Sequence, residues 1–349
     1  MATSPPPSEA KPRVSVVIPV RNGEAELAKC LAALGASTTR DVDVVVVDDG
    51  SSDNSAGLAR EWGARVLVQA PSRGAAAARN RGGAEARGDI LLFIDADVLV
   101  EPTTIAEITA LFEREDVGAV IGSYAPVTPA PGFFSKFKNI HHHYIHQISR
   151  EDAATFWTGC GAVRREAFRA AGGFDEDVYG GATIEDIEFG YRLHRAGYGI
   201  RLAKDIQVRH LKRYNLWSLM KSDIFNRAIP WTKLMMFRRH FRSDLNTTPS
   251  NAVSVLLAGA IVGCLLAAPF RLWALAGVPI FFALFTLNTM PFNRYVKKHF
   301  GWGFTVASVL MSVWYFFYAG IGLVLGVAAA LGEAAFGSAG RRAAPKAAR

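Results

Sequence analysis

The first hundred residues alternate between short hydrophobic runs and longer amphipathic stretches. Three short, largely apolar runs each predict a strand: Val14–Val20, Val42–Val47 and Arg65–Gln69. The stretches between them, Glu24 to Leu34 and one that ends near Trp62, are typical of helices. Strands that alternate with helices at this spacing predict an α/β fold with a mostly parallel, doubly wound sheet.

A further apolar run ends in two carboxylates one residue apart. The run from Ile90 to Ile94 predicts a fully buried strand, and Asp95-Ala96-Asp97 follows it directly. Alternation along an extended backbone puts Asp95 and Asp97 on the same side, where their charges repel unless a cation is close. Carboxylate oxygens suit Mg²⁺ or Mn²⁺, and ligands of such sheets bind beyond the carboxyl ends of the strands. Taken alone, the segment fits equally well a strand followed by an Asp-rich turn.

Residues 252–331 are almost continuously apolar. The stretches Ala252–Phe270, Leu272–Met290 and Phe304–Leu331 approach or exceed the length of about 20 residues that spans a bilayer. The Lys and Arg residues of Asn293–His299 favour a cytosolic loop. We therefore expect about three spans in residues 251–332. Three spans place the basic tail, residues 333–349, outside, against the positive-inside tendency, and a hairpin in the last stretch is the alternative.

The net charge of +8 is concentrated just before the apolar block. Residues 201–244 contain eleven Lys and Arg against three acidic residues, with aromatic side chains interspersed. Basic and aromatic residues beside a membrane span indicate a segment at the level of anionic headgroups, and they argue against nucleic acid as a partner. We predict that residues 212–250 form a basic amphipathic interfacial segment in which Arg213, Arg227 and Trp231 face the membrane or an acceptor.

The N-terminus and the cysteines favour a cytosolic location for the part before the apolar block. Residues 1–12 are rich in Pro and Ser and lack the apolar core of a signal peptide, so we expect a short disordered lead. The three cysteines are odd in number and have no metal-ligand spacing. The expected location is the inner cell membrane, with several spans and a cytosolic N-terminal domain.

Several motifs, in their order along the chain, resemble those of family 2 glycosyltransferases of the GT-A fold. On the donor side they are Val14-Ser15-Val16-Val17-Ile18-Pro19, Val47-Asp48-Asp49-Gly50-Ser51, Arg73-Gly74 to Asn80, and Asp95-Ala96-Asp97. On the acceptor side they are Thr158-Gly159-Cys160-Gly161, Gly172-Gly173-Phe174-Asp175 and the run from Glu185 to Leu193. The resemblance covers residues 14–212 and implies a GT-A domain, Rossmann-like with a mostly parallel sheet, over residues 13–211. The absence of Gly-x-Gly-x-x-Gly after the first strand argues against a dinucleotide site.

The resemblance implies roles in the displacement of a nucleoside diphosphate from a sugar. Asp49 would contact the nucleotide base, Asp95 the ribose or a metal-bound water, and Asp97 a Mg²⁺ or Mn²⁺ ion on the diphosphate. His210, at the end of a strand, would be a further ligand of that metal. The resemblance also assigns four residues to donor binding: Pro19, Arg21, Gly74 and Gly159.

Residues of the acceptor half would activate the nucleophile. The resemblance makes Asp186 the general base that takes the proton of an acceptor hydroxyl, with Glu185 in support. Without the resemblance, Asp49 is a turn residue and His210 an interfacial histidine. Glu185 and Asp186 are then merely favourable charges in the first turn of a helix.

Two other features invite chemical interpretations that we do not favour. Cys160 is interpreted as a small packing residue, because direct displacement needs no covalent cysteine. The cluster of His141, His142, His143 and His146 has no carboxylate partner and lies near lysines, which favours a contact with an acceptor or phospholipid over a metal site.

These motifs predict a membrane-anchored, inverting, metal-dependent glycosyltransferase. It would move one sugar from a UDP- or GDP-linked donor to a hydroxyl of a lipid or lipid-linked acceptor at the cytosolic face. A polyprenyl-phosphate glycosyltransferase resembles the same layout, but an ionised phosphate needs no general base, so Asp186 favours the hydroxyl. A processive polysaccharide synthase fits less well, because Asn226 to Trp231 departs from the Gln-x-x-Arg-Trp pattern. A membrane scaffold that had lost its activity would lack some of the acidic residues that the resemblance assigns, and all of them are present.

Overall fold

The computed structural model describes residues 13–176, 183–238 and 248–341. Contacts divide the chain into two compact units, one of Met1–Tyr124 with Glu151–Leu211 and one of Ala125–Arg150 with Lys212–Arg349. The predicted lead, residues 1–12, lies outside the described residues, as does most of the predicted basic tail.

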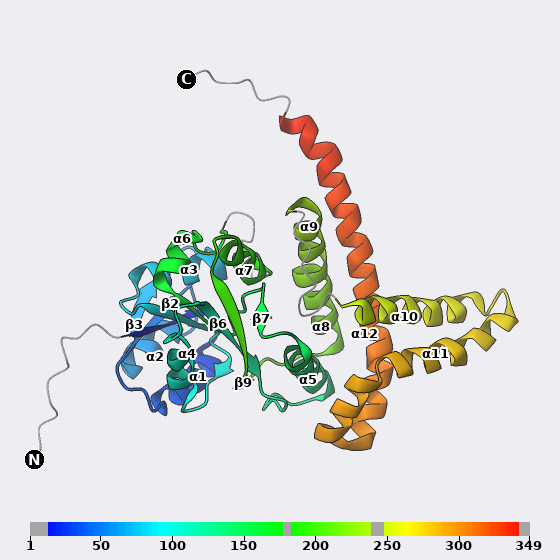
Figure 1. Cartoon of the computed structure of the whole chain (residues 1–349), viewed down its shortest axis with the longest axis horizontal. Coiled ribbons are helices and arrows are strands. Elements are labelled where there is room, and N and C mark those ends of the chain that lie inside the picture. Colours follow the sequence, from blue (N-terminus) through cyan, green and yellow to red (C-terminus); the bar gives the residue numbers. More distant parts are fainter. Residues whose placement is uncertain (1–12, 177–182, 239–247, 342–349) are drawn as a thin grey trace, which may run out of the picture. The chain divides into compact units, whose positions relative to one another are not determined.

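The first unit is built on a nine-stranded sheet, whose first four strands are parallel (Figure 1). In sheet order these strands are β3 (Arg65–Val68), β2 (Val42–Asp48), β1 (Val14–Val20) and β4 (Ile90–Ile94). The connecting helices are α1 (Glu24–Gly35), α2 (Ser55–Trp62) and α3 (Ala75–Glu85). The strands and helices predicted from the hydrophobic pattern in this half are confirmed. All five residues of β4 are buried, as its continuous apolar run predicted.

The second half of the sheet is mixed rather than parallel. It continues with β8 (Cys160–Arg164), β6 (Val117–Tyr124), β9 (Gly199–His210) and β5 (Val98–Leu99), while β7 (Asp152–Ala153) also pairs with β9. Strand β8 is antiparallel to both of its neighbours, and β6 and β9 are parallel. The remaining helices of this unit are α4 (Thr104–Leu111), α6 (Arg165–Ala170) and α7 (Glu185–Arg195).

An aromatic cluster fixes α7 against the sheet. Phe93 of β4 contacts the ring of Phe174 at 5.2 Å between centroids, and Phe174 contacts Phe189 of α7 at 4.7 Å. Phe156 and Phe168 complete the cluster. Large buried aromatic rings contribute strongly to packing, so the start of α7 is held in place relative to the end of β4.

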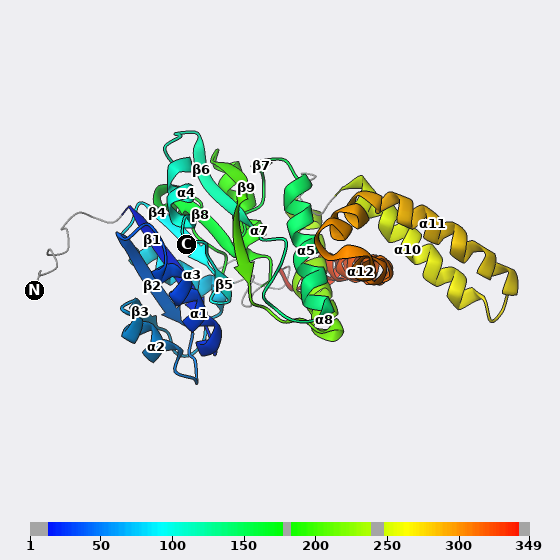
Figure 2. The ribbon, with the colours of Figure 1, turned by 90° about the horizontal axis from the view of Figure 1, so that it is seen from below.

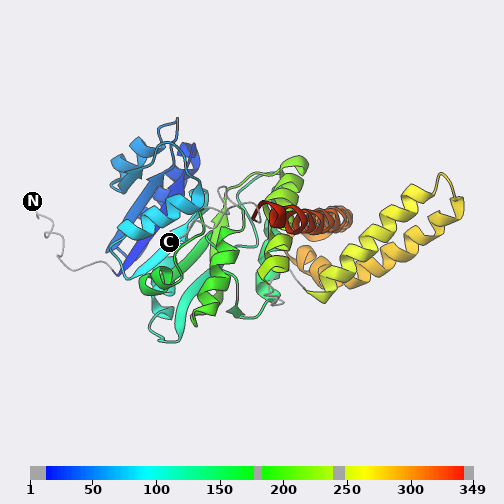
Figure 3. The same ribbon diagram turned by 90° about the horizontal axis from the view of Figure 1, so that it is seen from above.

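The second unit is helical. Its elements are α5 (Phe133–Ile148), α8 (Leu216–Asp223), the π-helical turn η1 (Ile224–Ala228), α9 (Ile229–Arg238), α10 (Pro249–Ala267), the 3₁₀ turn η2 (Leu272–Ala276), α11 (Gly277–Asn288) and α12 (Met290–Arg341). Helices α10 and α11 form an antiparallel pair (Figures 2 and 3).

Helix α5 groups with the C-terminal unit, although our prediction placed residues 125–150 inside the first domain. The reason is its aromatic face: Phe133 contacts Phe304, and Phe137 contacts Phe292 and Tyr315, all three on α12. The predicted domain end near residue 211 coincides with the division after Leu211.

Among the residues that the structure describes, two helical segments are long and apolar enough to cross a membrane, Pro249–Ala267 and Met290–Ala335. The middle stretch that we predicted as a span forms a shorter apolar helix, Leu272–Asn288. Only 17% and 28% of the most apolar windows of the two long segments are buried in the chain. Most of their apolar side chains therefore face outwards, which is typical of a surface that meets membrane or another protein.

The prediction of a loop over Asn293–His299 is wrong, because these residues are helical and belong to the beginning of α12. Phe292 and Val296 are buried against α5 and its neighbours, while the basic side chains of the segment point outwards. An amphipathic helix buries this apolar side, whereas a loop would not. Gly301, with φ of +76°, then interrupts the helix before its apolar part.

Candidate active site

Asp97 and His210 lie together at one edge of the sheet. Strands β5 and β9 pair so that Val98 lies opposite His210, and the Leu211 N–H donates to the Asp97 carbonyl at 2.8 Å. This pairing brings Nε2 of His210 within 3.3 Å of Oδ2 of Asp97. The imidazole also stacks on Tyr124 of β6, with ring centroids 4.5 Å apart and planes 8° from parallel.

A carboxylate beside an imidazole fits one side of a divalent-cation site. Both side chains are partly exposed, so an ion has access to them. In the described part of the chain, no group of three or more His, Cys, Asp or Glu side chains is arranged to hold a metal. Mg²⁺-type ions in phosphate-transfer sites are commonly held by one or two protein groups together with substrate phosphates. The pair therefore fits a cation that is shared with a diphosphate.

Arg79 connects the two acidic motifs. Its guanidinium donates to Asp95 at 2.8 Å and to Glu185 at 2.7 Å, and its side chain is only 5% exposed. Burial disfavours its charge, but the carboxylates of Asp95 and Glu185 outweigh that effect and raise the pKa of Arg79 above its usual value. No role for Arg79 was predicted. The available signal was weak, because α3 contains a second arginine, Arg81, and only the fold makes Arg79 the buried one.

Asp186 lies in the first turn of α7, half-buried at the edge of the site. Its Oδ1 accepts from the Ile187 N–H at 2.8 Å, and its Oδ2 lies 3.3 Å from the N–H and 3.4 Å from the hydroxyl of Thr158. Glu185 instead points inwards, to Arg79 and to the Thr183 N–H. The two carboxylates thus differ in their contacts: Asp186 contacts backbone N–H groups and a hydroxyl, whereas Glu185 is held by the buried charge of Arg79.

Asp49 organises the loop that precedes α3. Its two oxygens accept from the Gln69 amide, the Ser72 hydroxyl and the N–H groups of Arg73 and Gly74, at 2.5–2.9 Å. Burial opposes the charge, but these donors lower the pKa of Asp49 below its usual value. Four donors fill the acceptor positions of a carboxylate. The geometry thus favours an indirect role, in which Asp49 fixes the loop that a nucleotide sugar would meet. A direct contact between Asp49 and a nucleotide base stays a prediction.

The other predicted donor residues surround the same end of the sheet. Pro19 is in β1 beside Val47 of β2, and Arg21 is exposed just after that strand. Gly74 has φ of +91°, which a side chain would strain, and caps α3. Gly159 has no room for a side chain, because a Cβ there would lie 2.4 Å from the Trp157 ring.

Cys160 is fully buried in β8, and burial raises the pKa of its thiol to about 12. The thiol is therefore protonated at neutral pH and unsuited to nucleophilic attack. This supports the interpretation of Cys160 as a packing residue.

A second connection, which was not predicted, joins α3 to the Gly-Gly-Phe motif. The Asn80 amide donates to the Phe174 carbonyl and to Glu176 at 2.8 Å, and its oxygen accepts from the Phe174 N–H. Arg73 contacts Glu176 at 2.7 Å. Helix α3 and Arg73, in the loop before it, are thus tied to the segment Phe174–Glu176 of the same unit.

The three residues predicted to face membrane or acceptor belong to the C-terminal unit and separate there. Arg227 and Trp231 line one cavity, whereas Arg213 is exposed and is not part of its lining. Trp231 is buried, whereas Trp217 and Phe225 of the same basic segment are exposed.

Comparison with known proteins agrees with this geometry. A family profile described as glycosyl transferase family 2 matches residues 15–172. A probable glycosyltransferase, YdaM, of Bacillus subtilis is 30% identical over 207 residues, covering 54% of this chain and 48% of that protein. The pre-mycofactocin glycosyltransferase of Mycobacterium tuberculosis is 29% identical, covering 65% of this chain and 49% of that protein. The chain thus spans about half the length of these relatives.

The fold itself has a solved counterpart. A mannosyltransferase from Pyrobaculum calidifontis, solved in complex with GDP-Man and Mn²⁺, superposes with a TM-score of 0.58 at 18% identity. The likeness covers 90% of this chain and 88% of that one. At this identity it establishes the shared fold. The order of the motifs, the sheet and the profile match together show that the chain contains a glycosyl transferase family 2 domain with the GT-A fold.

Proposed function

We propose that the protein is an inverting, metal-dependent glycosyltransferase that moves one sugar from a nucleotide sugar to a hydroxyl of a lipid or lipid-linked acceptor. The observation that carries this proposal is the Asp97–His210 pair, 3.3 Å apart, at the sheet edge that also holds Asp95. The structural neighbour was solved with GDP-Man and Mn²⁺, which supports a donor and a cation of this kind.

Each residue of the site has a separate proposed role in a displacement at the anomeric carbon. Asp97 and His210 would hold Mg²⁺ or Mn²⁺, which supplies neutralising charge to a departing diphosphate. Arg79 holds Asp95 in place beside them. The loop that Asp49 organises presents the N-terminus of α3, whose positive dipole end favours negative charge.

Asp186 is the proposed general base. It is half-buried in the first turn of α7, where the N–H and hydroxyl of Thr158, at 3.3 and 3.4 Å from its Oδ2, hold the carboxylate in position for an acceptor hydroxyl. A positioned base contributes about 10²–10⁴ in rate. A single displacement with one base inverts the anomeric centre.

Membrane attachment belongs to the same proposal. The exposed apolar faces of α10 and α12 support an anchor, and the basic segment before them supports a cytosolic catalytic domain. A phosphate acceptor is a second candidate, favoured by the basic cavity of the C-terminal unit.

Binding and transfer can be tested in turn with the purified full chain in detergent. Thermal unfolding with UDP or GDP, with and without Mn²⁺, should show stabilisation by at least one nucleotide that depends on the cation. Incubation of membranes with labelled nucleotide sugars should then label a lipid that mass spectrometry identifies. No stabilisation by any nucleoside diphosphate would remove the basis of the proposal. A product labile to mild acid would favour the polyprenyl phosphate over the hydroxyl acceptor.

A further inference from the structure

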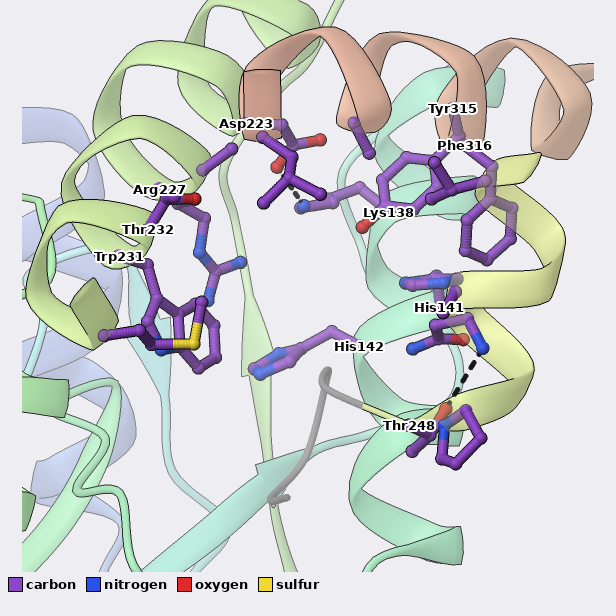
Figure 4. A pocket seen from close by; sticks show the side chains of 18 residues that line it. Lys138, His141, His142, Asp223, Arg227, Trp231, Thr232, Thr248, Tyr315 and Phe316 are labelled. Atoms are coloured by element: carbon purple, nitrogen blue, oxygen red, sulfur yellow. Dashed lines mark hydrogen bonds and ion pairs between the residues drawn. The ribbon is translucent and has the colours of Figure 1, made fainter. Parts of the chain in front are cut away.

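The C-terminal unit contains a cavity of about 540 Å³, lined by residues of α5, α8, η1, α9, α10 and α12 (Figure 4). This volume lies in the range of small-molecule binding sites. Every lining residue belongs to the second unit, so the cavity is a feature of that unit alone.

The lining is divided by chemistry, and the division follows the elements. Helices α5, α8 and α9 with η1 contribute most of the polar groups, among them Lys138, His142 and Arg227. Helices α10 and α12, the two apolar candidates for membrane spans, contribute a largely apolar wall that includes Val255, Phe316 and Leu323. A ligand that fills this space needs a polar end and a hydrocarbon end.

The polar end favours an anion. Asp223, the carboxylate of the lining, is paired with Lys138 and accepts from the Tyr318 hydroxyl at 2.9 Å. Burial lowers the pKa of His141 to about 3, reinforced by the charge of Lys138, so this imidazole is neutral. With Lys138 and Asp223 offsetting one another, Arg227 leaves the lining with a net positive charge.

A buried donor points to the same end. Trp231 is only 8% exposed, yet its indole N–H has no hydrogen-bond partner among the described residues. Buried donors nearly always have a partner, because an unmade bond costs free energy. Arg227, Trp231 and His142 point into the same cavity (Figure 4), so an oxygen-rich group bound there would meet all three.

We propose that this cavity binds a lipid phosphate, with the phosphate beside Arg227 and Trp231 and the hydrocarbon chain along α10 and α12. Arg and indole N–H groups donate to phosphate oxygens, and charge-assisted bonds of this type are the strong ones. The proposal goes beyond the transfer reaction, because it concerns the C-terminal unit alone. It holds both for a phosphate-bearing acceptor and for a phospholipid of the bilayer.

The test measures binding of radiolabelled geranylgeranyl phosphate to the full chain in a neutral detergent. We expect geranylgeraniol, which lacks the phosphate, to bind at least tenfold more weakly. Arg227→Gln should weaken binding of the phosphate about tenfold, and Trp231→Phe, which keeps a ring but removes the N–H, about threefold. Each variant must unfold at the temperature of the parent protein, so that a binding loss is not a folding loss.

Two exposed residues of α8 provide matched controls. Lys221→Gln removes a charge and Trp217→Phe removes an indole N–H, both outside the cavity, and neither should change binding. Competition by phosphatidylglycerol as strong as by the unlabelled probe would assign the site to a bilayer lipid, and its absence to a lipid monophosphate; both support a lipid-phosphate site. Equal binding of the alcohol, equal competition by inorganic phosphate, or equal losses in the controls would each overturn it. Stabilisation by UDP or GDP, measured on the same variants, reports on the donor site separately.

Discussion

The buried guanidinium of Arg79 provides the strongest single test of how this site is assembled. Replacing Arg79 with Met removes the charge that lies 2.8 Å from Asp95 and 2.7 Å from Glu185. The Glu185 side chain is only 4% exposed, so its carboxylate would be left buried without its cation. Removing one partner of a buried ion pair costs about 3–5 kcal/mol. Asp95, 32% exposed, adds less because solvent screens it.

This loss is large enough to measure by thermal unfolding. For a domain of 150–250 residues, 1 kcal/mol shifts Tm by about 2–4 °C, so Arg79→Met should lower Tm by roughly 6–20 °C. Arg79→Lys keeps the charge but cannot bond both carboxylates in a fixed fork, and it should recover only part of this loss. Because Asp95 is released, the affinity for a nucleoside diphosphate with Mn²⁺ should also fall in Arg79→Met.

The Arg65–Asp43 pair supplies a matched control. These residues are paired at 2.8 Å near the amino ends of β2 and β3, away from the carboxyl ends where the site lies. Arg65→Met should lower Tm and leave the affinity for the nucleotide unchanged. The reasoning is refuted if Arg79→Met keeps the parent Tm, or if both variants lose nucleotide affinity in proportion to stability.

Three further predictions concern the Asp97–His210 pair, Asp186 and Asp49. Asp97→Asn and His210→Gln should each reduce the Mn²⁺-dependent part of nucleotide binding at least tenfold, by calorimetry, while an effect without Mn²⁺ would contradict a shared cation site. Asp186→Asn should reduce transfer about 10²–10⁴-fold in a radiolabel assay with donor affinity within twofold, and retained transfer would shift the acceptor from a hydroxyl to a phosphate. The lowered pKa of Asp49 means that its ionised form stabilises the fold above its unfolded pKa, and that this contribution is lost as the pH falls through the lower folded value. Asp49→Asn should therefore be less stable at pH 7 by about 1–3 kcal/mol and lose less than the parent on acidification below about pH 4, in unfolding curves taken across that range.

Local patterns in the chain predicted the parallel half of the sheet well. The run that became β4 is continuously apolar, and those that became β1 and β2 are largely apolar, with Ser15 and Asp43 as the polar residues inside them. Short apolar runs of this kind are typical of strands buried on both faces of a sheet. Because the apolar runs end where the strands end, Asp49, Asp95 and Asp97 could also be placed at the carboxyl ends of β2 and β4. The mixed half was not predicted, because antiparallel pairing of β8 with β4 depends on contacts between distant segments.

The errors and omissions share a physical cause, which is long-range packing. Arg79 acquires its role from Glu185, far along the chain, and no local pattern in α3 announces that partner. The charges of Asn293–His299 suggested a loop, but the helix buries Phe292 and Val296 and leaves those charges outside. Helix α5 belongs to the second unit, not to the first domain as predicted, because its aromatic rings pack on α12. This packing also depends on residues that are distant in the sequence.

The stacked rings of Tyr124 and His210 have a consequence for the proposed metal site. Tyr124 is the last residue of the first unit before the chain leaves it, and His210 precedes the second exit by one residue. Both exits follow neighbouring parallel strands, and the Leu211 N–H is hydrogen-bonded to the Asp97 carbonyl. The ring stack, the backbone bond and the Asp97–His210 pair all lie within the first unit. The spacing of the two proposed metal ligands therefore depends on contacts of the first unit alone, at the two strand ends from which the chain leaves it.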